Sequence, residues 1–392
     1  KDACRVNKET LSEQTLPDYL LLYVDIGNVD STGAVAELQE MSFADAPSRA
    51  RRVVQSGDTI ISTVRTYLRA IRYFQDAPDN LIASTGFAVL SPGPMIDASF
   101  LALLVRSEPF IQRVVAESEG VGYPAIAPSK LAGFYVWIPP LPEQRAIAAY
   151  LDREAARIDA LTAKQQRLIA LLGAKRTALI TRAVTRGLDE AAPLKDSGVA
   201  WLGQVPEHWE VTRLKRVARM AYGESLPEAD RIDGAVPVFG SNGWVGTHSN
   251  SNTDSPTVII GRKGSYGKVV YSESRAFVID TAFYVDSTTT ESDIRWLFYL
   301  LATLDLDESS EDSAVPGLSR ESVYAKQVPL PPLPEQRAIA AYLDRETARI
   351  DALVAKVEQA IARLHEYRRA LITAAVTGQI DVRAMTQEVS TP

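Results

Sequence analysis

Two stretches of the chain carry apolar residues with the spacing of a long helix that packs along one side. Apolar positions alternate at intervals of four and three residues, which is typical of a coiled-coil stripe. A single helix cannot bury such a stripe, so we expect the two helices to pack antiparallel against each other. The stripe consists of Ile147, Leu151, Ile158, Leu161, Leu168, Leu172 and Leu179 in the first stretch, and of Ile339, Leu343, Ile350, Leu353, Val357, Leu364 and Leu371 in the second.

Proline and glycine mark the ends of these predicted helices. Pro142 is favourable in a first helical turn, and the helix dipole favours the negative charge of Glu143 beside it. Gly187 and Gly378 are typical of helix ends. Each helix would run for about 40 residues and, if continuous, for roughly 60 Å.

The regions ahead of the helices have a different pattern. Short β-branched or aromatic runs, bounded by Gly, Pro, Ser and Asp, predict strands, for example at 59–64, 257–260 and 276–285. Short helices are expected at 99–117 and 292–304. We therefore predict an α+β fold in which two strand-rich domains are separated by two long antiparallel helices.

Both helices begin with the same sequence. Pro-Pro-Leu-Pro-Glu-Gln-Arg-Ala-Ile-Ala-Ala-Tyr-Leu-Asp-Arg-Glu occurs at 139–154 and again, 192 residues later, at 331–346. A repeat of this length indicates one architectural unit used twice, related by a pseudo-twofold axis. The preceding regions are much less alike, so a common frame carries two different inserts. The predicted division is 1–138 and 201–330 for the strand-rich domains, 139–187 and 331–378 for the helices, 188–200 for a linker and 379–392 for a tail.

Composition narrows the classes of protein. One cysteine, Cys4, excludes a disulfide framework and is typical of a reducing cytoplasm. The sequence contains no run of about 18 uncharged apolar residues, so we expect no membrane span. The net charge is -7, yet basic residues cluster at 49–72, 162–187, 213–219 and 262–268. Solvated faces would account for any one cluster, but four together favour a polyanionic partner.

Catalytic and metal-binding patterns are missing from the sequence. Three histidines and one cysteine cannot form a Cys/His metal cluster, and we expect His248, in a polar Gly/Ser/Asn loop, to be exposed. Neither a dinucleotide fingerprint nor an Asn/Asp-Pro-Pro-Tyr/Phe run of an amino-methyltransferase occurs. The glycine-rich run 261–269 lacks phosphate-loop spacing. We therefore predict a chain without catalytic or metal-ligating residues.

Binding chemistry remains, and it gathers in polar loops beside the predicted strands. Arginine and lysine at 262–268 suit phosphates or guanine edges, and Asn242 suits an adenine edge. The alternative is a surface hairpin that is basic by chance. Our predicted DNA contacts are Arg65, Tyr67, Arg69, Ser84, Thr85, Tyr123, Ser241, Asn242, Trp244, Arg262, Lys263, Ser265, Tyr266, Lys268 and Thr281.

The chain resembles the specificity subunits of type I restriction–modification systems over nearly its whole length. The resemblance lies in the doubled Pro-Leu-Pro-Glu-Gln-Arg motif, in Trp201-Leu-Gly-Gln-Val-Pro-Glu-His-Trp-Glu-Val and in Gly261-Arg-Lys-Gly-Ser-Tyr-Gly-Lys-Val. It implies two target-recognition domains that each read half of a split DNA site, with the helices setting the gap.

The resemblance also implies partners. Methyltransferase subunits that carry S-adenosylmethionine would dock on this chain, a restriction translocase could join them, and this chain would hold no cofactor. A lead-in similar to 201–219 is expected ahead of the first domain, so we expect that domain to be shortened at Lys1. Two alternatives stay open: a coiled-coil scaffold that touches no DNA, and the recognition part of a single-chain restriction–modification enzyme.

Overall fold

The computed structural model describes residues 3–308 and 317–382, and it divides into two compact units. The first unit contains 1–166 and 358–392, and the second contains 167–357. The two predicted long helices are present as α4 (Leu141–Arg186) and α8 (Leu333–Val376), and each contributes one part to each unit. The mixed helix and sheet architecture confirms the predicted α+β fold.

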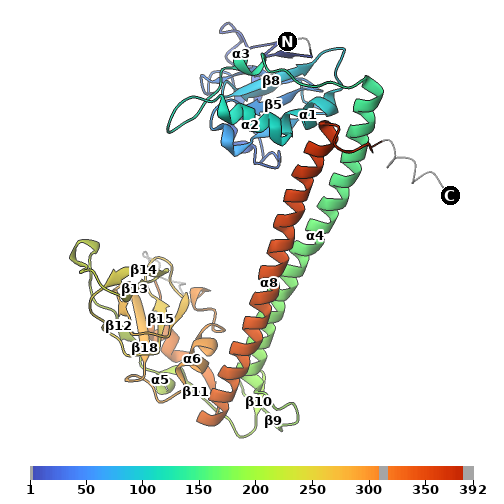
Figure 1. Ribbon diagram of the computed structural model, residues 1–392. Helices are drawn as coiled ribbons and strands as arrows, with labels where there is room; N and C mark the ends of the chain where they lie inside the picture. The colour runs from blue at the N-terminus through green and yellow to red at the C-terminus, as the bar shows by residue number, and fades with distance from the viewer. Residues whose placement is uncertain (1–2, 309–316, 383–392) are drawn as a thin grey trace, which may run out of the picture. The chain divides into compact units, whose positions relative to one another are not determined.

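The first unit contains two four-stranded sheets (Figure 1). One has the order β1-β8-β5-β6 and is antiparallel throughout; the other has the order β3-β2-β7-β4, with β2 and β7 parallel. Its elements are β1 (Cys4–Val6), β2 (Leu20–Val24), η1 (Ile26–Asn28), β3 (Gln39–Ser42), β4 (Ala50–Val53), β5 (Thr59–Ser62), η2 (Thr66–Leu68), β6 (Ile71–Tyr73), β7 (Leu81–Ser84), β8 (Phe87–Pro92), α1 (Ala98–Arg106), α2 (Glu108–Ala116) and α3 (Pro128–Leu131).

The second unit repeats the first sheet with the order β12-β18-β15-β16. A three-stranded sheet, β14-β13-β17, again contains one parallel pair, and β11 pairs with β19. The two inserts thus share the topology of this four-stranded sheet. The elements are β9 (Leu194–Asp196), β10 (Gln204–Pro206), β11 (Glu210–Arg213), α5 (Leu214–Val217), β12 (Ala221–Tyr222), η3 (Glu228–Asp230), β13 (Val236–Gly240), β14 (Gly243–His248), β15 (Thr257–Gly261), β16 (Val269–Ser272), β17 (Phe277–Val278), β18 (Ala282–Asp286), α6 (Ile294–Leu301), η4 (Leu306–Glu308), α7 (Arg320–Ala325) and β19 (Gln327–Leu330).

A buried glutamine explains why the same sequence opens both long helices. In α4, Gln144 Oε1 accepts a hydrogen bond from Asp97 N at 2.7 Å, and Gln144 Nε2 donates to Pro139 O. In α8, Gln336 Oε1 accepts from Asp293 N at 2.8 Å, and Gln336 Nε2 donates to a carbonyl of the preceding Pro-Pro pair. Each amide therefore links the start of a long helix to the capping aspartate of a shorter one, α1 or α6.

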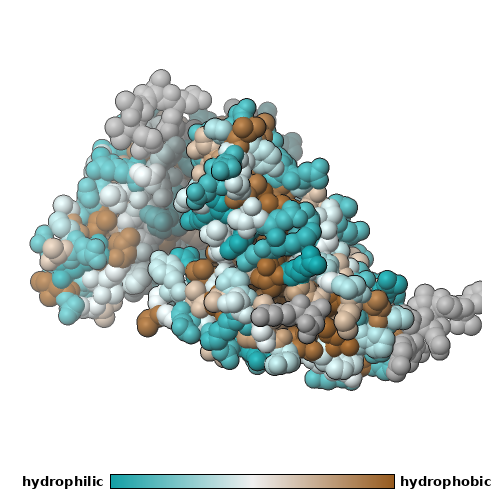
Figure 2. Space-filling model, turned by 90° about the horizontal axis from the view of Figure 1, so that it is seen from above, coloured by the Kyte–Doolittle hydropathy of each residue, from teal (hydrophilic) through white to brown (hydrophobic). Residues whose placement is uncertain are grey.

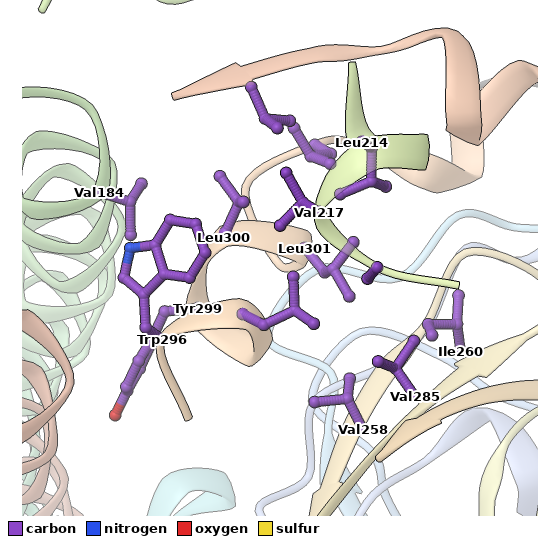
Figure 3. Packing of buried hydrophobic residues seen from close by; sticks show 14 of the residues in the cluster. Val184, Leu214, Val217, Val258, Ile260, Val285, Trp296, Tyr299, Leu300 and Leu301 are labelled. Carbon is purple, nitrogen blue, oxygen red and sulfur yellow. The ribbon is translucent and has the colours of Figure 1, made fainter. Parts of the chain in front are cut away.

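Each unit buries the helices against its own sheet-and-helix layer. In the second unit the core joins Val184 of α4 to Trp296 of α6 and to Ile260 of β15 (Figure 3). Figure 3 shows the Trp296 ring lying beside Val184, with the strand residues on the far side of α6. In the first unit the corresponding core joins Ile147 of α4 to Phe100 of α1. Among the described residues, no helix combines the length and apolar character needed to cross a membrane.

The two helices pair within each unit in antiparallel fashion. In the first unit Arg368 of α8 donates to Asp159 of α4 at 2.8 Å, and in the second unit Arg176 of α4 pairs with Asp351 of α8. The predicted stripe is buried near the helix ends that carry a domain, at Ile147, Leu151, Ile158, Ile339, Leu343 and Ile350.

The stripe prediction is wrong for three leucines farther from those ends. Leu161 and Leu168 are each 42 % exposed and Leu353 is 48 % exposed. There the partner helix alone covers the stripe, and two helices cannot enclose every apolar side chain between them. The remaining stripe positions are partly buried: Leu172, Leu179, Val357, Leu364 and Leu371.

Candidate nucleic-acid interface

The loop after β15 lies tightly against a neighbouring turn in the second unit. A Cβ atom on Gly261 would lie 2.3 Å from Ser265 O and 2.7 Å from Ser241 O, so only glycine fits there. Gly264 and Gly267 adopt φ of 71° and 80°, a region that glycine enters without strain. The loop 261–268 is therefore folded back on itself and held against the β13–β14 turn.

Hydrogen bonds also join the loop 261–268 to the β13–β14 turn, and that turn to Thr281, just ahead of β18. Lys268 Nζ donates to Asn242 O at 2.7 Å and to Asn242 Oδ1 at 3.1 Å. Ser241 N donates to Thr281 Oγ1 at 3.2 Å. The structure thus gathers four predicted contact residues through hydrogen bonds that span 26 and 40 positions in the sequence, and it leaves Asn242 at the surface.

Arg262 is held by stacking. Its guanidinium lies 4.9 Å from the centre of the Tyr222 ring and 5.6 Å from that of Phe283, and its Nη1 donates to Asp280 O. Arg320 of α7 lies 4.8 Å from the centre of the Tyr222 ring, so that ring has two guanidinium groups against it, one from the loop after β15 and one from α7. Sequence reasoning missed Tyr222 and Arg320, because no local pattern connects them with the loop 261–268.

The remaining predicted contact residues of this unit differ in how accessible they are to a ligand. Trp244 is 65 % exposed, and Ser265 is also exposed. Lys263 forms an exposed ion pair with Asp280 at 3.2 Å, which a polyanion could replace at small cost. Tyr266 packs partly against the hydrophobic core. The outer face of these loops therefore presents a cationic and aromatic surface.

The first unit builds a smaller version from other residues. The Arg65 guanidinium lies 4.6 Å from the centre of the Tyr123 ring, and Arg65 N donates to Pro124 O at 2.8 Å. Tyr67 and Tyr123 are 53 % and 64 % exposed. Arg65 has φ of 52°, a left-handed conformation that is uncommon outside glycine and that is often found at binding sites.

One prediction for the first unit is wrong, and a second residue is occupied by an ion pair. Ser84 is 1 % exposed, and its Oγ accepts from Gly86 N, so it lies too deep to reach a ligand. Arg69 is already engaged, because its two Nη atoms donate to the carboxylate of Glu108 at 2.7 Å each. This ion pair lowers the pKa of Glu108 and raises the pKa of Arg69, since each charge stabilises the other. Thr85 is exposed, beside Arg49, whose O accepts from Thr85 N.

Metal chemistry finds no support in the described part of the chain. No group of three or more His, Cys, Asp or Glu side chains there could hold an ion. The expectation that His248 is exposed is wrong: it is 6 % exposed, and its Nδ1 accepts from Ile232 N at 3.0 Å. Its ring packs edge-on against Phe277, so it is a structural residue.

Figure 2 shows that hydrophobic residues on the face it displays lie in small separate patches among hydrophilic ones. Exposed aromatic side chains flanked by arginine and lysine, as in both loop clusters, suit stacking on bases together with phosphate contact.

Comparisons with known proteins identify the family of the chain. The type I restriction modification DNA specificity domain matches residues 47–170 and 206–363. The EcoDI specificity subunit of Escherichia coli is 21 % identical over 318 residues, which cover 73 % of this chain and 71 % of that protein.

Two solved structures share the fold. A chain of a type I restriction–modification system superposes with a TM-score of 0.72 at 24 % identity, covering 96 % of this chain and 98 % of that one. The HsdS subunit of Thermoanaerobacter tengcongensis gives a TM-score of 0.52 at 25 % identity, covering 96 % and 95 %. Since the domain match extends over more than half of the sequence and recurs in both units, the chain belongs to the family of type I restriction–modification specificity subunits.

Proposed function

We propose that this chain is the DNA-reading, non-catalytic subunit of a type I restriction–modification complex and that it binds a two-part DNA site. The observation that carries the proposal is the repeated sheet with different loops. Both units contain the same four-strand order, and the segment after β5 or β15 carries exposed basic residues in each. An exposed aromatic side chain accompanies them: Tyr67 of the same segment in the first unit, and Trp244 of the neighbouring β13–β14 hairpin in the second. One scaffold with two unlike loop clusters suits two unlike half-sites.

Each cluster offers groups for both phosphate and base contact. In the second unit Arg262 and Lys263 are suited to phosphates or to guanine O6 and N7, and the Asn242 amide is suited to an adenine edge. In the first unit Arg65 and the exposed rings of Tyr67 and Tyr123 would play the corresponding part. The major groove distinguishes all four base pairs, so we place the loops there.

The long helices would set the distance between the two DNA-reading domains and would bind the partner subunits. A helix rises 1.5 Å per residue, so adding one turn to each helix changes the spacing by about 5.4 Å. Leu161, Leu168 and Leu353 expose apolar surface on the helices, which supports docking of a methyltransferase subunit there. That subunit would carry S-adenosylmethionine and the catalytic residues, a translocase subunit could join, and we expect the complex in the cytoplasm.

A loop exchange tests the proposal. The loop 261–268 would be replaced by a hairpin of equal length from another family member, in a complex with the methyltransferase subunit. We expect a map of methylated adenines to change in one half-site while the other half-site and the gap stay the same. A change in both half-sites, or in neither, would refute the proposal.

A charge test separates a DNA reader from a scaffold. We expect Lys263→Ala to weaken DNA binding by the complex and to reduce the slope of log K against log salt by about one, because one phosphate contact is lost. Lys356→Ala on α8, also exposed, is the matched control and should leave the slope unchanged. A salt slope that is the same in Lys263→Ala, in Lys356→Ala and in the unaltered complex would favour the scaffold alternative, in which this chain makes no phosphate contact.

A further inference from the structure

A cationic cavity in the first unit has no part in the loop cluster described above. It has a volume of about 460 Å³ and lies between the segment after η1, the α1–α2 layer and the last turns of α8. Four arginines and a histidine line it, against one glutamate: Arg69, Arg106, His365, Glu366, Arg368 and Arg369.

Only two of these four guanidinium groups are neutralised by the chain itself. Arg69 is paired with Glu108, and Arg368 is paired with Asp159 at 2.8 Å. Within the described residues, Arg106 and Arg369 make no ion pair. The cavity therefore holds two positive charges that lack a carboxylate within salt-bridge distance.

The surroundings of Arg106 are built to hold a guanidinium rather than to neutralise it. Arg106 Nη2 donates to Ile71 O at 2.8 Å. Gly33, with φ of 84°, passes so close that a Cβ there would lie 2.0 Å from Arg106 Nη2. The pKa of Arg106 is lowered to about 10, mainly by burial and also by the charges of Arg368 and Arg72, with Asp30 opposing them. A bound anion would relieve this repulsion.

We propose that this cavity binds a phosphate group. Arg106 and Arg369 carry forked N–H donors that match phosphate oxygens, and Ser31 also lines the cavity. Two guanidinium groups without an ion pair, set against the single carboxylate of Glu366, leave a positive lining that suits an anion with several acceptor oxygens. Ile111 and Ile372 also line the cavity, so there is room for an apolar group attached to the phosphate.

The phosphate can come from a free phosphate ester or from the DNA backbone, and the second source rests on the proposed function. The probe is phenyl phosphate, titrated calorimetrically into the full chain. We expect Arg106→Met and Arg369→Met each to weaken binding about tenfold or more. The control is Arg363→Met. Arg363 is an exposed arginine of α8 that does not line the cavity, so this variant should bind phenyl phosphate as the unaltered chain does.

The result that overturns the proposal is no binding by the unaltered chain up to about 10 mM, or equal binding by all variants. Arg369 lies at the surface of α8, so its variant keeps the test valid even if Arg106→Met fails to fold. In the assembled complex, competition between phenyl phosphate and DNA, lost in Arg369→Met, would assign the site to the DNA backbone. Phenyl phosphate binding without such competition would assign it to a free ester. Neither outcome depends on the loop exchange that tests DNA reading.

Discussion

The two units use the same helix-start sequence but give one of its aspartates different roles. In the second unit Asp344 Oδ1 accepts hydrogen bonds from Arg295 Nε and from Tyr299 OH, both at 2.6 Å. In the first unit the matching Asp152 is exposed and makes no hydrogen bond or ion pair within the described residues. The same residue in the same local sequence is thus a structural anchor in one place and a solvated side chain in the other.

The difference comes from the short helix that packs on each copy. The capping aspartates Asp97 and Asp293 bond to the matching glutamines, so α1 and α6 can be aligned from them. By that alignment, the positions of Arg295 and Tyr299 are occupied in α1 by Ser99 and Leu103, which cannot form the same bonds. The short helix of the insert, rather than the repeated long helix, therefore decides which polar side chains of the long helix form stabilising hydrogen bonds.

The largest loss of stability is expected from replacing the glutamine that links a long helix to a short one in both units. Gln144→Leu and Gln336→Leu would each leave buried backbone groups without partners, at a cost of about 2–5 kcal/mol. Gln144 also bonds to Met95 O, so we expect the larger loss in the first unit. Hydrogen exchange read separately over α1 and α6 would locate the loss. Equal protection in the variants and the unaltered chain would show that the glutamines do not link the helices.

A smaller effect is expected where the units differ. Asp344→Asn should destabilise the second unit by about 1–3 kcal/mol, because charge-assisted hydrogen bonds to Arg295 and Tyr299 are weakened. Asp152→Asn is the matched control and should change stability by less than about 0.5 kcal/mol. Chemical denaturation of both variants measures this. If the two substitutions cost the same, the comparison between the copies is wrong.

The one sequence difference just after the repeated motif should have a still smaller effect. Thr347 is 4 % exposed, and its Oγ1 donates to Leu343 O and lies 3.4 Å from Tyr299 OH, whereas the first copy has Ala155. Thr347→Ala should cost about 1 kcal/mol through the lost methyl and hydroxyl contacts. Ala155→Thr should add no comparable stability, since no tyrosine faces it. A stabilising Ala155→Thr would contradict this assignment.

The smallest effect concerns the Arg69–Glu108 ion pair of the first unit. The pair lowers the pKa of Glu108, so its contribution is complete above the carboxyl's unfolded pKa of about 4.3 and is lost as the pH falls through the folded pKa. Glu108→Gln should therefore lower stability by less than about 1 kcal/mol at pH 7, with the difference shrinking as the pH falls below about 4.3 and vanishing below the lowered folded pKa. A difference that grows with acid would contradict the assignment.

The sequence alone determined the repeated frame, the two long helices and the α+β class, because these follow from periodicity and from residues close together in the chain. It also placed Arg262, Lys268 and Asn242 in loops beside strands, although it could not say that they converge.

The tertiary structure alone decided which of those residues are available. Ser84 is buried, Arg69 is paired and His248 is enclosed because residues distant in sequence pack against them. Tyr222 entered the interface only through its contacts with Arg262 and Arg320. Leu161 and Leu353 stayed exposed because no domain covers them. Local pattern sets the elements, but burial and pairing depend on long-range neighbours that a single sequence does not display.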